Sequence, residues 1–254
     1  MMKNAMMTFL AVFAVTVAQA DQPRILAYTR NFVTGGKGFV HDNIAANIAA
    51  LKQLGAENGF EVDTSDDPVV FTDDNLKKYK ELVFANSNNE AFSNDEQRDA
   101  FKRYIRAGGG FVGIHSASGS ERQWPWFWAL LGGSFSFHAP MQKFTVNVMD
   151  SDNPSTKFFN TNSFAWTDEF YVMKEQPEGL RILLAGNIKK LKMPDDQRKK
   201  ADAMPDSIPL AWCHTFEGGR SFYTALGHRK TDYSDPDFRG HILGGILWAM
   251  GHDK

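Results

Sequence analysis

The residues best suited to chemistry in this sequence are its histidines. Imidazole titrates near neutral pH, so a histidine can act as a general base, a general acid or a metal ligand. Five of the seven histidines fall where strand ends or loops are expected, and these are His41, His115, His138, His214 and His228. Acid/base or metal chemistry is therefore expected from side chains that follow strands.

His115 has the most informative surroundings. It follows the apolar run Phe111–Ile114, which is typical of a strand covered on both faces, and glycines 108–110 separate that run from a helical pattern. In an open α/β sheet, ligands bind in the crevice beyond the carboxyl ends of the strands. We therefore expect His115 on a sharp turn at this crevice, acting as a catalytic base or acid.

Three further histidines are expected at the same edge. His41 follows a glycine-rich loop after the first predicted strand, His138 precedes a strand, and His228 ends the apolar run 222–227. Loops after parallel strands open onto one edge of the sheet. We predict that His41, His138 and His228 converge beside His115, as contacts to substrate or metal.

Each of these histidines also has a structural alternative. His41 could cap the helix that starts near Asn43, and a histidine close to Pro140, such as His138, often bonds only to backbone. His214 belongs to an apolar strand pattern, so a structural role is favoured there.

A pair of carboxylates follows an aromatic segment at Thr167–Glu169. One of them could serve as a general acid or base, or orient a histidine. We expect Glu169, ahead of Asp168, to be the partner of His115. The alternative is a solvated turn.

A divalent metal ion such as zinc is a second use of these imidazoles. The candidate ligands are His41, His115, His138 and His228. Because no H-x-H or H-E-x-x-H spacing occurs, the ligands would have to gather from distant loops. The sequence therefore leaves the cofactor open.

Aromatic residues crowd the segment after His115. Trp124 lies among several of them and could stack on a sugar ring, and the neighbouring Arg122 could bond sugar hydroxyls. At helical spacing, however, such aromatic side chains belong more often to the core.

The elements that must position these residues alternate in the first half of the chain. Strand patterns at 24–29, 60–63, 81–85 and 111–114 alternate with helical patterns at 43–57, 73–79 and 93–106, which predicts a mainly parallel sheet with helices on both faces. The second half carries strand patterns at 143–149, 165–173, 181–185, 210–216 and 220–226, and a closing helix at 235–250. The charged segment 189–200 is expected to be a solvated loop.

Residues 1–20 have the pattern of a secretory signal peptide, with Lys3, an apolar run and a small-x-small end at Ala18–Ala20. We expect a single domain over residues 21–254, exported to the periplasm or beyond, with no stable membrane anchor after cleavage. The net charge of −2 makes nucleic acid a poor candidate partner. The only cysteine, Cys213, excludes an internal disulfide and is expected to be buried and inert.

Several long segments carry a family resemblance. They are 38–44, 104–117, 124–126, 167–169, 211–214, 218–228 and 238–248. On these motifs the chain resembles the ThuA-like (trehalose utilisation) proteins of the class I glutamine amidotransferase-like superfamily. The resemblance implies a flavodoxin-like three-layer sandwich and a role in carbohydrate metabolism. Amidotransferases of that superfamily carry a nucleophilic cysteine at the position of His115, so the resemblance implies this fold without glutaminase activity.

Together these features predict an exported enzyme whose partner is a small carbohydrate, such as a keto sugar or a disaccharide. The expected chemistry is isomerisation, elimination or hydrolysis by acid/base catalysis. The alternative is a non-catalytic sugar-binding protein that uses the same pocket. The substrate and the oligomeric state stay open.

Overall fold

A mixed sheet forms the centre of the protein in a computed structural model that describes residues 22–36 and 38–252. The predicted signal peptide lies outside these residues. The strand order is β2-β1-β3-β4-β9-β8-β7-β5-β6. The strands are β1 (Arg24–Tyr28), β2 (Glu61–Ser65), β3 (Glu81–Ala85), β4 (Gly110–Ile114), β5 (Ser134–Val148), β6 (Ser163–Lys174), β7 (Arg181–Asn187), β8 (Ser207–Phe216) and β9 (Gly219–Thr224).

The sheet is parallel in one half and antiparallel in the other. Strands β1, β2, β3, β4 and β9 are paired in parallel. The central strands β3 and β4 are buried along their whole length, as their continuous apolar runs require. From β9 onward, β8, β7, β5 and β6 are joined by antiparallel pairs. This arrangement agrees with the predicted flavodoxin-like α/β sandwich with extra antiparallel strands.

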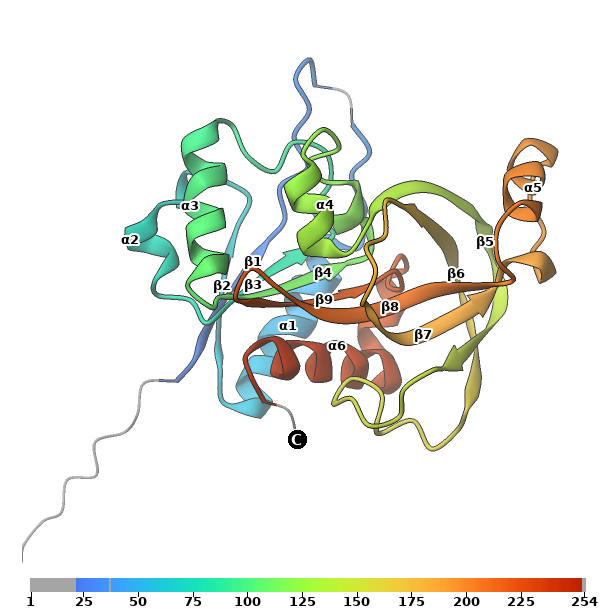
Figure 1. The fold of residues 1–254 in the computed structure, drawn as a ribbon. Coiled ribbons are helices and arrows are strands. Elements are labelled where there is room, and N and C mark those ends of the chain that lie inside the picture. Colours follow the sequence, from blue (N-terminus) through green and yellow to red (C-terminus); the bar gives the residue numbers. More distant parts are fainter. Residues whose placement is uncertain (1–21, 37, 253–254) are drawn as a thin grey trace, which may run out of the picture.

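Helices cover both faces of the parallel half (Figure 1). Helices α1 (Ile44–Asn58) and α6 (Pro236–Ala249) lie on one face, and α3 (Asp95–Arg106) and α4 (Pro125–Leu131) lie on the other. The short helix α2 (Asp73–Leu76) packs beside α3. Within the described residues, no helix has the length and apolar character needed to cross a bilayer.

Two segments differ from the sequence-based prediction. Part of the charged segment expected to be a loop forms helix α5 (Asp195–Asp202). Its acidic residues lie in the first turn and its basic residues in the last, which complements the helix dipole. Strand β5 also begins earlier than predicted, so His138 lies within a strand rather than in a loop. The strand accommodates Pro140 at an irregularity between Ala139 and Gln142, where no regular pairing is required.

Candidate functional site

The site is built around the turn that follows β4. His115 is fully buried and its backbone is left-handed, with φ of 49°. Residues other than glycine are uncommon in this conformation, so the turn at His115 is a special backbone feature. The hydroxyl of Tyr223 donates to the carbonyl oxygen of His115 at 2.8 Å and fixes the turn. The predicted sharp turn is therefore present, and it presents the His115 ring to the strand edge.

The second imidazole, that of His228, follows the neighbouring strand β9. Ile114 pairs with Thr224, so the chains leaving β4 and β9 run side by side. The Nδ1 atom of His115 lies 2.7 Å from the carbonyl oxygen of Ala225, which places the proton on Nδ1. The other nitrogen, Nε2, therefore presents a lone pair, and it lies 3.3 Å from Nδ1 of His228.

The two adjacent carboxylates separate because side chains alternate across a strand. Glu169, on β6, points into the site, with Oε2 lying 3.3 Å from Nδ1 of His228 and 3.8 Å from Nε2 of His115. Asp168 points to the opposite face, where it accepts hydrogen bonds from the backbone N–H of Gly227 at 2.9 Å and from Nε1 of Trp166 at 3.1 Å. Asp168 thus holds the loop that carries His228, and Glu169 joins the site.

His41 completes what we call the imidazole cluster, namely His41, His115, His228 and Glu169. Its ring lies 4.9 Å from the ring of His115 and 5.1 Å from that of His228, measured between centroids. The side chain is buried, and neither ring nitrogen has a hydrogen-bond partner among the residues that the structure describes. The first turn of α1 therefore gains no cap from His41.

Burial and mutual contact set the charges of the cluster. Burial, helped by the imidazoles of His115 and His228, lowers the pKa of His41 to about 3. Burial likewise lowers the pKa of His115 to about 3. The hydrogen bond to Glu169 raises the pKa of His228 above its usual value. Burial disfavours the ionised form of Glu169, but the hydrogen bond from His228 and the other imidazoles lower its pKa overall. At neutral pH, His41 and His115 are neutral and Glu169 is ionised.

A small pocket opens beside the cluster. It has a volume of about 170 Å³ and is lined by Phe39, His41, Asn88, Arg122, Phe135, His138, Glu169 and Tyr171. The His138 side chain is 39% exposed, and its Nδ1 lies 3.5 Å from Oε1 of Glu169. The guanidinium of Arg122 donates to the carbonyl oxygen of Gly119 and to the side chain of Asn88. The structure therefore brings Arg122 and His138 to the site as expected.

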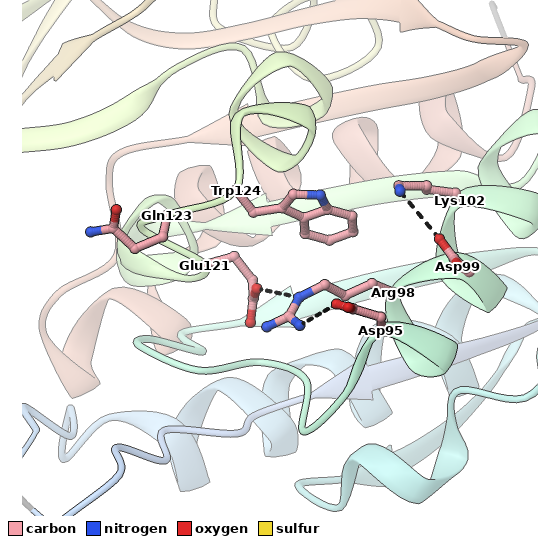
Figure 2. Close-up of a pocket in the computed structure, with 7 residues that line it drawn as sticks. All are labelled: Asp95, Arg98, Asp99, Lys102, Glu121, Gln123 and Trp124. Atoms are coloured by element: carbon pink, nitrogen blue, oxygen red, sulfur yellow. Dashed lines mark hydrogen bonds and ion pairs between the residues drawn. The ribbon is translucent and has the colours of Figure 1, made fainter.

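Trp124 lies elsewhere. It lines a separate surface pocket, about 530 Å³ in volume, between α3 and the chain before α4 (Figure 2). There Arg98 is already paired with Glu121 and Asp95, and Lys102 with Asp99. The indole packs against Phe92 and its helix neighbours, because it immediately precedes the buried aromatic turn of α4. The structure thus gives Trp124 no contact with the imidazole cluster.

Two adjacent residues of β8, Cys213 and His214, have structural surroundings. His214 makes a contact of 2.8 Å to the carbonyl oxygen of Leu130, in agreement with the structural role favoured for it. Cys213 is fully buried, and burial raises the pKa of its thiol to about 12, which makes it a poor nucleophile.

Sequence reasoning missed several pocket residues. Tyr171 packs on His115, with ring centroids 4.1 Å apart. It lies two residues after Glu169 on one strand, so the period of two would have placed both on one face. Phe39 and Asn88 carried no comparable signal, because both come from irregular loops.

The imidazole cluster has the composition of a cation site. One ligand atom from each of its four residues lies within 4.8 Å of the other three, and His138 does not belong to this set. Neutral imidazoles and a carboxylate are the ligands that zinc and related divalent ions prefer.

The strand order and the turn after β4 define an α/β sandwich that carries His115 at the carboxyl end of a central parallel strand. The family model described as "Trehalose utilisation" (ThuA) matches residues 30–249, and the chain belongs to this family. No curated protein matches the sequence significantly.

Several solved structures share the fold. A ThuA-like protein from Bacteroides uniformis has a TM-score of 0.70 at 22% identity, over 94% of this chain and 95% of that one. A ThuA-like protein from Parabacteroides merdae has a TM-score of 0.68 at 19% identity, over 91% of each chain. PurLQS from Thermotoga maritima shares the fold more distantly, with a TM-score of 0.53 at 12% identity over 89% of this chain and 99% of that one.

Proposed function

We propose that this chain is an enzyme that acts on a carbohydrate by acid/base chemistry in the pocket beside the imidazole cluster. The observation that carries the proposal is the position of Glu169, which contacts His138, His115 and His228 and also lines the pocket. A carboxylate among imidazoles at the mouth of a crevice is an arrangement suited to moving protons.

The pocket walls suit a sugar. Phe39, Phe135 and Tyr171 provide apolar faces, whereas Asn88 and Arg122 provide hydrogen-bonding groups that can fix hydroxyl oxygens. A pocket of about 170 Å³ is smaller than the ~300–1,000 Å³ of sites for larger ligands, which favours one sugar ring or one end of a disaccharide. The family description, trehalose utilisation, supports the same substrate class.

His138 is the best placed proton carrier. His115 was expected to be the base, but a pKa of about 3 makes its imidazole a weak base at neutral pH. The side chain of His138 is partly exposed on the pocket wall, and its Nδ1 lies 3.2 Å from the carbonyl oxygen of Ala139 and 3.5 Å from Oε1 of Glu169. We assign proton transfer to His138 and its positioning to Glu169. His115 contributes the lone pair of its Nε2 atom, whose direction the bond from Nδ1 fixes.

For a keto sugar, the chemistry follows from these roles. His138 removes a proton from the carbon next to the carbonyl, and the C–H electron pair moves into the enolate. His138 then returns the proton. For isomerisation, His138 delivers the proton to the former carbonyl carbon, while the hydroxyl on the deprotonated carbon gives its proton to the enolate oxygen and becomes the new carbonyl. For elimination, the enolate re-forms the carbonyl together with a carbon–carbon double bond, the glycosidic C–O bond breaks, and His138 protonates the departing oxygen. Export to the periplasm or beyond is part of the proposal, and its support is the N-terminal sequence pattern.

The test compares turnover of trehalose and of 3-keto-glycosides by the full chain and by variants. His138→Gln and Glu169→Gln are each expected to lower turnover by about 100-fold or more. His214→Gln is the matched control, since this histidine lies outside the pocket, and it should keep full activity. Sugar-dependent thermal stabilisation without any product would instead establish the sugar-binding alternative.

A further inference from the structure

We propose that the imidazole cluster binds one divalent metal ion, and that zinc is the ion that fits it best. The ligands are His115 through Nε2, His228 through Nδ1, Glu169 through Oε2, and His41 through a ring nitrogen. The inference deepens the proposed function and rests on the same site, but its test does not depend on turnover.

The distances among three of the ligand atoms match a metal site. Nδ1 of His228 lies 3.3 Å from both Nε2 of His115 and Oε2 of Glu169, and the last two atoms are 3.8 Å apart. A triangle with these edges has a circumradius of about 2.0 Å, close to the ~2.0–2.2 Å of zinc–nitrogen and zinc–oxygen bonds. One ion near the centre of this triangle can therefore contact all three atoms without rearrangement of the backbone.

His41 supplies the second, independent observation. Its side chain is only 4% exposed, and both ring nitrogens lack a hydrogen-bond partner among the described residues. Buried polar atoms are nearly always satisfied, so an orphaned imidazole needs an explanation. A ligand atom of His41 lies within 4.8 Å of each of the other three ligand atoms, so His41 is close enough to be the fourth ligand. A metal ion would satisfy this nitrogen.

The surroundings of His115 follow the pattern of metal-binding histidines. Such histidines usually donate their other ring N–H to a carbonyl or carboxylate, which fixes the tautomer and aims the free nitrogen at the metal. The bond of 2.7 Å from Nδ1 of His115 to the carbonyl of Ala225 does this.

The donor set also selects the ion. Three imidazole nitrogens and one carboxylate oxygen suit zinc and similar first-row ions, whereas magnesium and calcium prefer sites made of oxygen alone. His138 faces the other oxygen of Glu169 and stays outside the ligand set, free to carry protons. A bound divalent ion would stabilise the negative oxygen of an enolate next to the cluster.

The experiment measures zinc directly. The purified full chain is dialysed against zinc chloride and then against zinc-free buffer, and its zinc content is determined by inductively coupled plasma mass spectrometry. We expect one zinc ion per chain. His41→Ala and His228→Gln should each weaken zinc binding by at least about tenfold. The variants His138→Gln and His214→Gln should keep one zinc ion per chain.

Two results would overturn the proposal. One is a wild-type chain that retains no zinc, which is informative whatever the variants do. The other is unchanged zinc affinity in His41→Ala and His228→Gln, with circular dichroism confirming that both are folded. A chain that binds zinc at this site but converts no sugar would keep the metal centre and remove the proposed function.

Discussion

The Nδ1 atom of His115 donates a hydrogen bond of 2.7 Å to the carbonyl oxygen of Ala225, which lies 110 residues further along the chain. This bond links the turn after β4 to the chain leaving β9. It also decides which ring nitrogen faces the imidazole cluster, and so the chemistry available to His115.

His115→Asn separates these two roles. Asparagine tolerates the left-handed backbone at this position, and its amide can replace Nδ1 as donor to Ala225. It has no counterpart of Nε2. The variant should fold with nearly the same melting temperature, while turnover falls by about 10–100-fold because the proposed metal ion loses a ligand. Thermal unfolding and a kinetic assay on one sample check both parts, and wild-type turnover would show that Nε2 is not needed.

Asp168→Asn tests the positioning of the His228 loop. The carboxylate of Asp168 accepts hydrogen bonds from the N–H groups of Gly227 and Trp166, and an amide nitrogen in the same place cannot accept them. Loss of such buried bonds should lower the free energy of unfolding by about 1–3 kcal/mol. Urea unfolding measures this change. The control is Asp66→Asn at an exposed position, expected within about 0.5 kcal/mol of wild type. Equal stability of the two variants would contradict the positioning role.

His241 should contribute to acid sensitivity. It is fully buried in α6, its ring makes a contact of 2.9 Å to the carbonyl oxygen of Ser155, and burial lowers its pKa from 6.5 to about 4. Between these two pH values the unfolded chain binds a proton that the folded chain does not, so stability falls as pH is lowered from 6.5 to 4. The loss from this one group is about 3 kcal/mol.

His241→Asn keeps a donor toward Ser155 and removes the titrating ring. Unfolding free energies of both proteins at pH 7, 6, 5 and 4 give the comparison. The variant should lose less stability over this range, although His41 and His115, whose pKa values are also lowered, keep part of the slope. Identical slopes would show that His241 does not titrate differently in the folded and unfolded states.

The parallel half of the fold and its edge could be predicted from sequence. Apolar runs, glycine stops and a capping pattern marked β1, β3, α3 and β4, and the rule for strand ends placed His115 beside His41 and His228. The opposite directions of Asp168 and Glu169 follow from strand alternation once the strand is recognised.

The positions of β5, β6 and Trp124 relative to the site depend on tertiary contacts, and no local sequence pattern predicts such contacts. Strands β5 and β6 pair at the far edge of the sheet, yet their paired segment near Phe135 and Tyr171 reaches back to the His115 turn. No spacing in the sequence encodes that approach. The indole ring of Trp124 is of a type that stacks on sugars, but its packing against Phe92 places it in another pocket.

X-ray diffraction data collected at the zinc absorption edge, from crystals of the full chain grown with zinc, test the imidazole cluster most directly. The expected result is one anomalous peak about 2.0–2.2 Å from Nε2 of His115, Nδ1 of His228 and Oε2 of Glu169. A map without a peak at this position, with Nε2 of His115 instead hydrogen-bonded to His228, would contradict a metal centre in this protein.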